Sequence, residues 1–569
     1  MMAGSAADSR RSPIGGFAHV RGDDNAPLLE LTVPQLLKQT VKRSPNGDAA
    51  VFCAANIRWS WSDLDHEVDA LAAGLLMLGL KQGDRIGIWG PNSPEWVLTQ
   101  FATARIGLVL VNINPAYRLA ELEYALKKVG CRAVIIAEVF KSSNYVGMIE
   151  TLAPELTAHH DGRLQAAKLP DLEFVIKMGD KPVAGMMRFG DVVDNGRKNG
   201  TLHLDAITAA LSLHDAINIQ FTSGTTGLPK GATLTHANVV NNAYFSVSTM
   251  NFTAADRLCI TVPLYHCFGM VLGALGCVAV GACMVFPGEG FEPVATLTAI
   301  ETESCTAVYG VPSMFATMLD VPNFRDFRLT SLRTGAMAGA PCPIELMKRV
   351  ISEMNISGIT ICYGMTETSP VSFQTSPTDT LERRVSTIGR VHPHVEAKIV
   401  DLNGKTVAPG LPGEICVRGY SIMLGYWDDD ARTRDAIKDG WMHTGDMGVI
   451  DEDGYASIVG RLKDMVIRGG ENIYPREIEE FLLRNSKIRE VQVFGVPDEK
   501  FGEELCAWIV CREGQTLTEE DVKEFCKGNI AHFKIPRYVR FRDELPLTVT
   551  GKAQKFKMRD EMIAELKSQ

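Results

Sequence analysis

An alternation of strand-like and helix-like segments between residues 60 and 137 constrains the fold of this chain more than any other feature. Ser60 followed by Asp63 resembles a capping box and predicts a helix that ends near Gly79. Apolar runs rich in β-branched residues then alternate with a further helical segment. This βαβαβ rhythm predicts a parallel sheet covered by helices. The expected strands are residues 85–89, 108–113 and 131–137, and the expected helix between them covers residues 121–128.

The length of 569 residues exceeds what one hydrophobic core supports, so more than one domain is expected. After residue 390 the pattern changes to short strands separated by turns such as Asn403-Gly404. Beyond Asp464, helices over 477–484 and 519–527 and strands over 491–496 and 507–510 form a compact unit. Residues 1–25 are expected to be disordered. The predicted organisation is α/β, with βαβ-type subdomains and a small β-rich subdomain over residues 26–462 and a small α+β domain over residues 463–569.

Residues 221–231, Phe-Thr-Ser-Gly-Thr-Thr-Gly-Leu-Pro-Lys-Gly, predict a loop that binds phosphate. Glycines permit positive φ angles, so successive backbone N–H groups can curl around an anion. Because Gly231 follows Lys230, where a Walker A loop has Ser or Thr, this is not a Walker A loop. An ordinary Gly/Ser/Thr surface loop stays the alternative for this segment taken alone. The side-chain donors would be Thr222, Ser223, Thr225, Thr226 and Lys230.

Four further motifs follow in chain order. They are Tyr-Gly-Met-Thr-Glu at 363–367, Trp-Met-His-Thr-Gly-Asp at 441–446, Gly-Arg-Leu-Lys-Asp at 460–464 and Pro-Leu-Thr-Val-Thr-Gly-Lys at 546–552. With the phosphate loop they resemble the adenylate-forming enzymes, a family of acyl-CoA synthetases, luciferases and peptide-synthetase adenylation domains. In that family they serve as the adenine and magnesium segment, the ribose segment, the interdomain hinge and the site of a C-terminal lysine. The resemblance covers nearly the whole chain.

The resemblance implies that the protein uses ATP and Mg²⁺ to convert a carboxylic acid into an acyl-AMP, with release of pyrophosphate. Glu367 would ligate Mg²⁺, a hard ion that prefers oxygen ligands, and Thr366 would contact the α-phosphate. Asp446 would accept both ribose hydroxyls, because a carboxylate accepts two such bonds well. Tyr363 would stack on adenine and Arg461 would donate near the ribose. The expected ATP/AMP-binding residues are Thr222, Ser223, Gly224, Thr225, Thr226, Gly227, Lys230, Gly339, Ala340, Pro341, Tyr363, Gly364, Met365, Asp446 and Arg461.

The resemblance also implies that the C-terminal domain is a mobile lid. Lys552 matches the lysine that bridges the substrate carboxylate and the α-phosphate, and Lys463 matches the hinge. After pyrophosphate leaves, rotation would withdraw Lys552 and bring residues 467–472 to the site. There Gly469 and Gly470 would let the pantetheine of CoA pass close to backbone.

His266 indicates which acid is activated. Relatives that activate amino acids usually have an aspartate here to pair with the substrate ammonium, so a histidine favours a simple carboxylic acid. Relatives restricted to acetate have tryptophan where this chain has Gly364, and glycine leaves room for longer acids. The sequence is most similar to the medium-chain acyl-CoA ligase subgroup. The expected catalytic residues are Lys552, His266, Thr366 and Glu367, and the expected acyl pocket is His266, Val308, Tyr309, Met337 and Gly364.

Net charge argues against nucleic acid as a partner. A net charge of −10 and a pI near 5.7 argue against nucleic acid, so phosphate must be bound by local donors.

The 13 cysteines are odd in number and lack Cys-x-x-Cys pairs, which is typical of a reducing compartment and not of a disulfide framework or a zinc site. The N-terminus lacks an apolar signal-peptide core, and Arg10-Arg11 are a weak hint of organelle import, so we expect a cytoplasmic protein.

Residues 258–288 contain no Asp, Glu, Lys or Arg and are long enough on hydropathy to span a bilayer. Pro263, His266 and several glycines interrupt the segment, and no basic cluster flanks it. We therefore expect a buried element that lines a pocket and no transmembrane segment. The sequence leaves open whether the chain forms a homodimer.

Several alternatives share the nucleotide motifs. A ligase that loads a carrier protein would not turn over free CoA, and a CoA ligase for a short thioether or aryl acid would differ only in its pocket. A luciferase-like oxygenase would emit light in the presence of oxygen. An inactive nucleotide-binding module is argued against by the presence of Lys552, Glu367 and Asp446. A structural role would leave the many phosphate donors unexplained.

We predict that Lys552→Ala abolishes acyl-AMP formation and spares the second half-reaction, thiolysis of supplied acyl-AMP. The reason is that the lysine would be withdrawn from the site before CoA reacts. Separate assays of the two half-reactions check this, and an equal loss of both would contradict a two-conformation mechanism.

Overall fold

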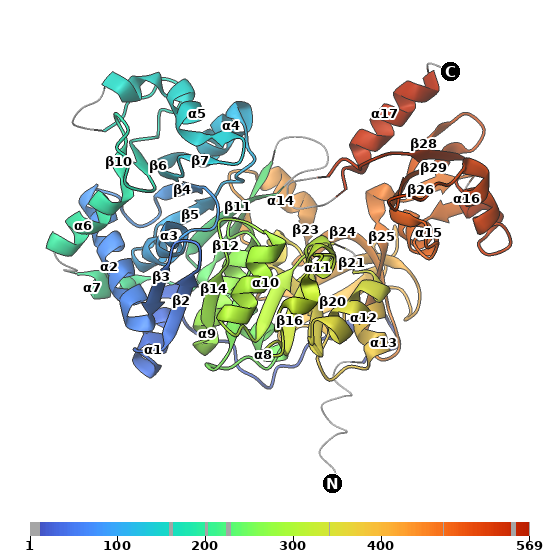
Figure 1. The fold of residues 1–569 in the computed structure, drawn as a ribbon, viewed down its shortest axis with the longest axis horizontal. Helices are drawn as coiled ribbons and strands as arrows, with labels where there is room; N and C mark the ends of the chain where they lie inside the picture. The colour runs from blue at the N-terminus through green and yellow to red at the C-terminus, as the bar shows by residue number, and fades with distance from the viewer. Residues whose placement is uncertain are drawn as a thin grey trace, which may run out of the picture.

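The computed structural model describes residues 12–158, 163–199, 203–222, 229–340, 342–469, 471–547 and 553–567. Two mostly parallel sheets with covering helices and a smaller antiparallel sheet form the larger part of the molecule (Figure 1). A smaller α+β unit at the C-terminus stands to one side (Figure 1). This is the α/β architecture predicted from the sequence.

The first sheet carries the predicted βαβ rhythm. Its strand order is β10-β9-β6-β4-β5-β11-β12-β22, parallel up to β11 and antiparallel beyond it. Thr222 pairs with Lys230 at the adjoining ends of β11 and β12, so the two ends of the predicted phosphate loop lie side by side. The strands are β10 (Met187–Arg188), β9 (Phe174–Lys177), β6 (Cys131–Ile136), β4 (Arg85–Trp89), β5 (Val109–Asn112), β11 (Ala216–Thr222), β12 (Lys230–Thr235) and β22 (Gly425–Tyr426).

The second sheet runs in the order β19-β18-β17-β16-β15-β13-β14-β2-β3, with parallel pairing from β17 to β2. Both faces are buried, as a parallel sheet requires. Its strands are β19 (Arg390–Val391), β18 (Val371–Gln374), β17 (Gly358–Gly364), β16 (Thr334–Ala338), β15 (Ala307–Gly310), β13 (Arg257–Ile260), β14 (Cys283–Phe286), β2 (Asp48–Phe52) and β3 (Ile57–Ser60).

Two helix layers cover this second sheet. Leu297, Phe315 and Met347, from three successive helices, pack on one face in a core shared with Val308. The opposite face packs on a larger core that extends to the first sheet. The helices of the large part are α1 (Val33–Arg43), α2 (Trp61–Met77), α3 (Pro94–Arg105), α4 (Leu119–Val129), α5 (Tyr145–Leu152), α6 (Phe189–Asn199), α7 (Leu204–Ala210), α8 (His236–Thr249), α9 (Gly276–Val280), α10 (Pro293–Thr302), α11 (Pro312–Leu319), α12 (Ile344–Glu353), α13 (Leu381–Ser386) and α14 (Asp430–Ala436).

Local signals placed the early elements correctly. Ser60 accepts a hydrogen bond from Asp63 N, and the Asp63 carboxylate accepts one from Ser60 N, so the capping box that opens α2 is present. Gly79 follows the end of α2 with φ of 83°. Helix α4 and strands β4, β5 and β6 lie within about two residues of their predicted ranges.

The third sheet shows where the expectation for the N-terminus was wrong. We expected disorder over residues 1–25, yet His19–Arg21 forms β1 and pairs with β20. Ala18 and Val20 are buried. Two apolar side chains in a Ser- and Gly-rich segment are therefore enough to hold an edge strand on this sheet. The order is β1-β20-β21-β24-β23, with β25 also paired to β24. The strands are β20 (Val395–Val400), β21 (Gly413–Gly419), β23 (Ile437–Lys438), β24 (Trp441–Ile450) and β25 (Ala456–Arg461).

The C-terminal unit has its own core around Val493 and Leu505. Strands lie in the order β27-β26-β29-β28, with β30 parallel to β29. The predicted helices and strands are present, and the two strands are longer than predicted, with β29 beginning five residues earlier, at Gly502. The elements are β26 (Val466–Arg468), β27 (Glu471–Ile473), α15 (Pro475–Leu482), β28 (Ile488–Asp498), β29 (Gly502–Cys511), α16 (Glu519–Cys526), β30 (Tyr538–Phe541) and α17 (Lys555–Lys567).

The charge-free segment is a buried element, as expected. It leaves β13, forms a π-helix η3 (Phe268–Leu275) and α9, and returns through β14. Every residue of η3 is buried. No helix within the described ranges has the length and apolar character needed to cross a bilayer.

Helices α2 and α6 pack so closely that glycine is required at their contact. A Cβ at Gly74 would lie 2.1 Å from the carbonyl oxygen of Val192, and one at Gly196 would lie 1.9 Å from that of Ala70. We predict that Gly74→Ala lowers the free energy of unfolding by about 1–3 kcal/mol, since the helices must separate. Gly190→Ala, also in α6 but with no atom within 4 Å of the added Cβ, is the control and should change it by less than about 1 kcal/mol. Equal effects of the two substitutions in urea unfolding would contradict this packing.

Candidate active site

The ends of the predicted phosphate loop meet a carboxylate from the second sheet. Thr222 Oγ1 at the end of β11 donates a hydrogen bond of 3.3 Å to Glu367 Oε1. Thr366 and Glu367 lie in a short 3₁₀ turn after β17, and both are buried. Residues 145 positions apart therefore adjoin at one point, as the motifs predict. Residues 223–228 lie outside the described residues.

A tyrosine that the sequence analysis missed connects Glu367 to Lys230. Tyr426 OH donates to Glu367 Oε1 at 2.8 Å and accepts from Lys230 Nζ at 2.9 Å. Burial, followed by the charge of Glu367, raises the pKa of Tyr426, so the phenol keeps its proton and acts as a donor. Tyr426 lies on the edge strand β22, 59 residues after Glu367, and no spacing in the sequence marks it.

Asp446 lies on β24 and receives groups from two other elements. Tyr363 OH, at the end of β17, donates to Asp446 Oδ2 at 2.8 Å, and Arg461 Nε lies 3.2 Å from Asp446 Oδ1. Arg461 is opposite Asp446 in the register of β24 with β25. The residues expected for adenine and ribose are thus brought together, and the carboxylate retains lone pairs for further donors.

Lys463 follows in the turn Leu462–Asp464. Burial lowers the pKa of this lysine and the charge of Arg461 lowers it further, with a contribution from Lys230, whereas Asp464 and Asp446 oppose them. The predicted hinge residue therefore belongs to the same electrostatic environment as the predicted phosphate and ribose residues. These cations favour an anionic ligand at this place.

His266 and the π-helix lie beside the end of β11. Cys267 Sγ contacts Gln220 Oε1 at 3.1 Å, and Gln220 lies two residues before Thr222. His266 is half-buried, and its Nδ1 accepts a hydrogen bond from Phe268 N at 3.2 Å. A π-helix is rare and is frequently found at functional sites.

The residues expected to line the acyl pocket are not all brought together. Tyr309 stacks on Phe268 with ring centroids 5.5 Å apart and belongs to the core that includes η3. Val308 and Met337 belong to the core on the opposite face of the sheet. Neighbouring residues of a strand point to opposite faces, so the three do not form one wall. The sequence analysis grouped Val308 with Tyr309 because they are adjacent in the chain, and it did not separate the two faces of the strand.

Close packing against the backbone also requires glycine at position 364. A Cβ at this position would lie 1.8 Å from the carbonyl oxygen of Pro370, where β17 pairs with β18 across an irregular register. Any side chain here would require the backbone to move. Met365 N donates to the same Pro370 oxygen at 3.0 Å, which fixes the turn before Thr366.

The other predicted site residues have these positions. Gly339 directly follows β16 with φ of 83°, with Ala340 after it, and Gly469 has φ of 59° in the turn between β26 and β27. Lys552, Pro341 and Gly470 lie outside the described residues.

Comparison with known proteins identifies the family. The profile described as "AMP-binding enzyme" matches residues 37–427, and "AMP-binding enzyme C-terminal domain" matches residues 477–552. The chain belongs to the AMP-binding enzyme family. Its relatives include the Danio rerio protein named medium-chain acyl-CoA ligase ACSF2, mitochondrial, 48% identical over 547 residues that cover 95% of this chain and 90% of the relative. The Rattus norvegicus protein of that name is 45% identical over 562 residues, covering 98% of this chain and 91% of the relative.

Solved structures of AMP-binding enzymes share the fold. The anthranilate CoA ligase AuaEII in complex with anthranoyl-AMP superposes with a TM-score of 0.83 at 27% identity, covering 96% of this chain and 99% of that one. ATP-bound MatB from Rhodopseudomonas palustris superposes with a TM-score of 0.77 at 28% identity, covering 94% and 99%.

We predict that Tyr426→Phe lowers kcat/KM for ATP by about 10- to 100-fold, because a hydrogen bond to a charged group contributes about 1.5–3 kcal/mol. Tyr455→Phe is the matched control, since its hydroxyl bonds to another carboxylate, Asp379, at 2.6 Å. Steady-state kinetics with varied ATP measure both variants. An unchanged rate in Tyr426→Phe would remove this tyrosine from the site.

Proposed function

We propose that this AMP-binding enzyme is an ATP-dependent acyl-CoA ligase for medium-chain carboxylic acids. It would form an acyl-AMP with release of pyrophosphate and then transfer the acyl group to the thiol of CoA with release of AMP. The proposal is supported by hydrogen bonds at Glu367, which accepts directly from Thr222 and from Tyr426, while Tyr426 in turn accepts from Lys230. The relatives named medium-chain acyl-CoA ligase support the choice of acid.

The nucleotide side supplies donors for phosphate and an acceptor for ribose. Lys230, Thr222 and the loop between them would hold the β- and γ-phosphates, and Thr366 would contact the α-phosphate. Asp446 would accept the ribose hydroxyls while Tyr363 and Arg461 hold its carboxylate in place. Fixed donors of this kind stabilise charge that develops in the transition state.

Glu367 fits the magnesium ion that this chemistry needs. Its carboxylate is buried among oxygen groups, with Thr222 Oγ1 at 3.3 Å and Tyr426 OH at 2.8 Å, and oxygen ligands suit a hard ion. Magnesium would neutralise phosphate charge when it is bound with ATP. Tyr426 would orient the carboxylate so that its remaining lone pairs face the phosphates.

The acyl chain would lie along η3. The carboxylate of the acid must reach the α-phosphate near Thr366, and β11 leads from that point back to Gln220, which contacts Cys267. His266 would face the head of the acid, and Tyr309 and Phe268 would pack on its chain. Val308 and Met337 would support this wall from the opposite face of the sheet.

The C-terminal unit would act as the lid. We propose a boundary at residues 462 and 463, with Lys552 serving adenylation and Gly469 and Gly470 serving the approach of CoA. The match to a separate C-terminal family profile supports an independent unit.

For the compartment, we propose the cytoplasm, with import into an organelle as the alternative favoured by relatives named mitochondrial.

Mass spectrometry of products tests the proposal. Purified protein is incubated with MgATP, CoA and straight-chain acids of two to sixteen carbons, and acyl-CoA plus AMP should peak at intermediate length. Acyl-AMP that accumulates without thioester would indicate that a carrier protein, and not CoA, accepts the acyl group. Failure of every acid to yield either product would overturn the medium-chain assignment.

An aryl acid is the second candidate. The structural neighbour with a TM-score of 0.83 is an anthranilate CoA ligase, and its match covers 96% of this chain. Including benzoate and anthranilate in the same series separates the two candidates. A higher kcat/KM for an aryl acid than for any straight-chain acid would favour this second reading.

A further inference from the structure

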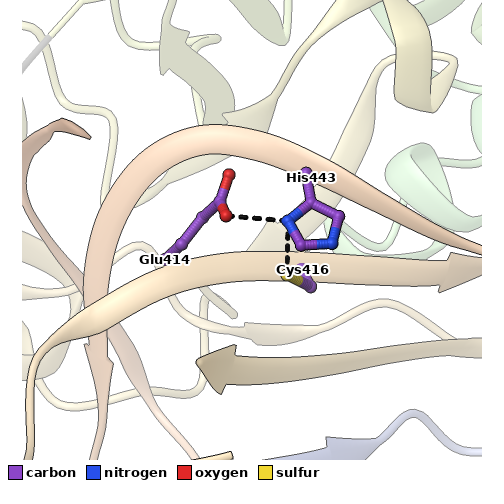
Figure 2. A group of neighbouring side chains, drawn as sticks. All are labelled: Glu414, Cys416 and His443. Carbon is purple, nitrogen blue, oxygen red and sulfur yellow. Dashed lines mark hydrogen bonds and ion pairs between the residues drawn. The ribbon is translucent and has the colours of Figure 1, made fainter. Parts of the chain in front are cut away.

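Three side chains of types that can ligate a metal ion lie together on the third sheet, outside the residues assigned to catalysis. Glu414 and Cys416 are two residues apart on β21, so they share one face of the strand, and His443 is the residue of β24 opposite Cys416. Figure 2 shows that Glu414 and Cys416 both approach the same ring nitrogen of His443. The ligand atoms of the three residues all lie within 4.8 Å of one another.

The geometry suits a zinc-like ion. Cys416 Sγ lies 3.5 Å from His443 Nδ1, and Glu414 Oε2 lies 2.7 Å from the same nitrogen. A tetrahedral ion with bonds of about 2.3 Å to sulfur and about 2.0 Å to nitrogen separates those two atoms by about 3.5 Å. The carboxylate would have to retreat from the nitrogen by about half an ångström to become the third ligand.

The chemistry of the ligands selects the ion. Thiolate and imidazole prefer zinc and similar borderline-soft ions, whereas Mg²⁺ prefers oxygen. Cys416 is fully buried, while Glu414 and His443 retain 17% and 22% of their side-chain exposure, which leaves an approach from solvent. Burial, followed by the charge of Glu414, raises the pKa of the Cys416 thiol to about 12, so the ion must displace the thiol proton.

The cluster is coupled to the predicted ribose carboxylate. Glu414 Oε1 accepts a hydrogen bond from Gly445 N at 3.0 Å, and Gly445 immediately precedes Asp446. Thr444 Oγ1 donates to Ile415 O at 2.8 Å, so β21 holds this part of β24 at two points. A movement of the Glu414 carboxylate toward a metal ion would therefore pull on the backbone that positions Asp446.

We propose that Glu414, Cys416 and His443 form an inhibitory site for a zinc-like divalent cation, whose binding weakens ATP binding by displacing the Gly445-Asp446 segment. Binding exchanges the thiol proton for the ion and moves the remaining imidazole proton from Nδ1 to Nε2, so one proton is released per ion when His443 is neutral. The effect on ATP rests on the proposed role of Asp446, whereas the binding of metal does not.

Cobalt absorption tests binding without any substrate. Full-length protein titrated with Co²⁺ should develop a thiolate-to-cobalt charge-transfer band that saturates at one ion per chain. Cys416→Ala should abolish the band, and Cys511→Ala, which removes a half-buried cysteine on β29, should retain it. A band that is absent from the wild type, or that Cys416→Ala does not change, would overturn the proposal.

A second measurement uses zinc and a variant that keeps the thiol. Competition with a chromogenic chelator should show Glu414→Gln binding Zn²⁺ at least tenfold more weakly than the wild type, and equal affinities would overturn the three-ligand site. This variant keeps the test valid if Cys416→Ala does not fold.

Kinetics at buffered free Zn²⁺ and excess Mg²⁺ test inhibition. The KM for ATP of the wild type should rise several-fold, while Cys416→Ala, with its basal rate retained, should not respond. An equal response of both proteins would overturn the inhibitory role. Acyl-CoA formation without the cobalt band would refute this inference and leave the proposed function intact, whereas the band without any product would do the reverse.

Discussion

The hydrogen bonds that converge on Glu367 are the interaction on which the proposed site depends. Glu367 belongs to the second sheet, whereas Thr222 and Tyr426 belong to strands of the first. The two sheets must therefore pack in one relative position for the buried Glu367 carboxylate to receive its hydrogen bonds. A buried carboxylate without partners would cost several kcal/mol, so the arrangement ties the packing of the sheets to the chemistry of the site.

The third sheet extends the site toward the C-terminal unit. Asp446 on β24 is held by Tyr363 from the second sheet and by Arg461 from β25, and the chain enters the predicted hinge turn directly after Arg461. Lys463 shares the electrostatic environment of Arg461, Asp446 and Lys230. Any anion bound between these groups is expected to affect the proposed hinge, and nucleotide binding would then be linked to the proposed movement of the C-terminal unit.

The sequence predicted the elements that local signals determine and missed those that depend on packing. The Ser60 capping box and the strand at 85–89 were found because their signals are local. The strand at His19–Arg21 was missed because its pairing with β20 is remote. For the same reason the family motifs pointed to Glu367 and Asp446 but not to Tyr426, and the sequence analysis grouped Val308 with Tyr309 although they face different cores. The cluster of Glu414, Cys416 and His443 also depends on pairing between strands.

Exchange of labelled pyrophosphate into ATP, measured without CoA, shows whether the protein forms an acyl-AMP. It reports reversal of the adenylation step alone and does not depend on the thiol acceptor. We expect exchange that requires both Mg²⁺ and an added acid and that is greatest for acids of medium length. Exchange that proceeds without an acid, or an active ligase that shows none until CoA is added, would contradict an acyl-AMP intermediate formed at this site.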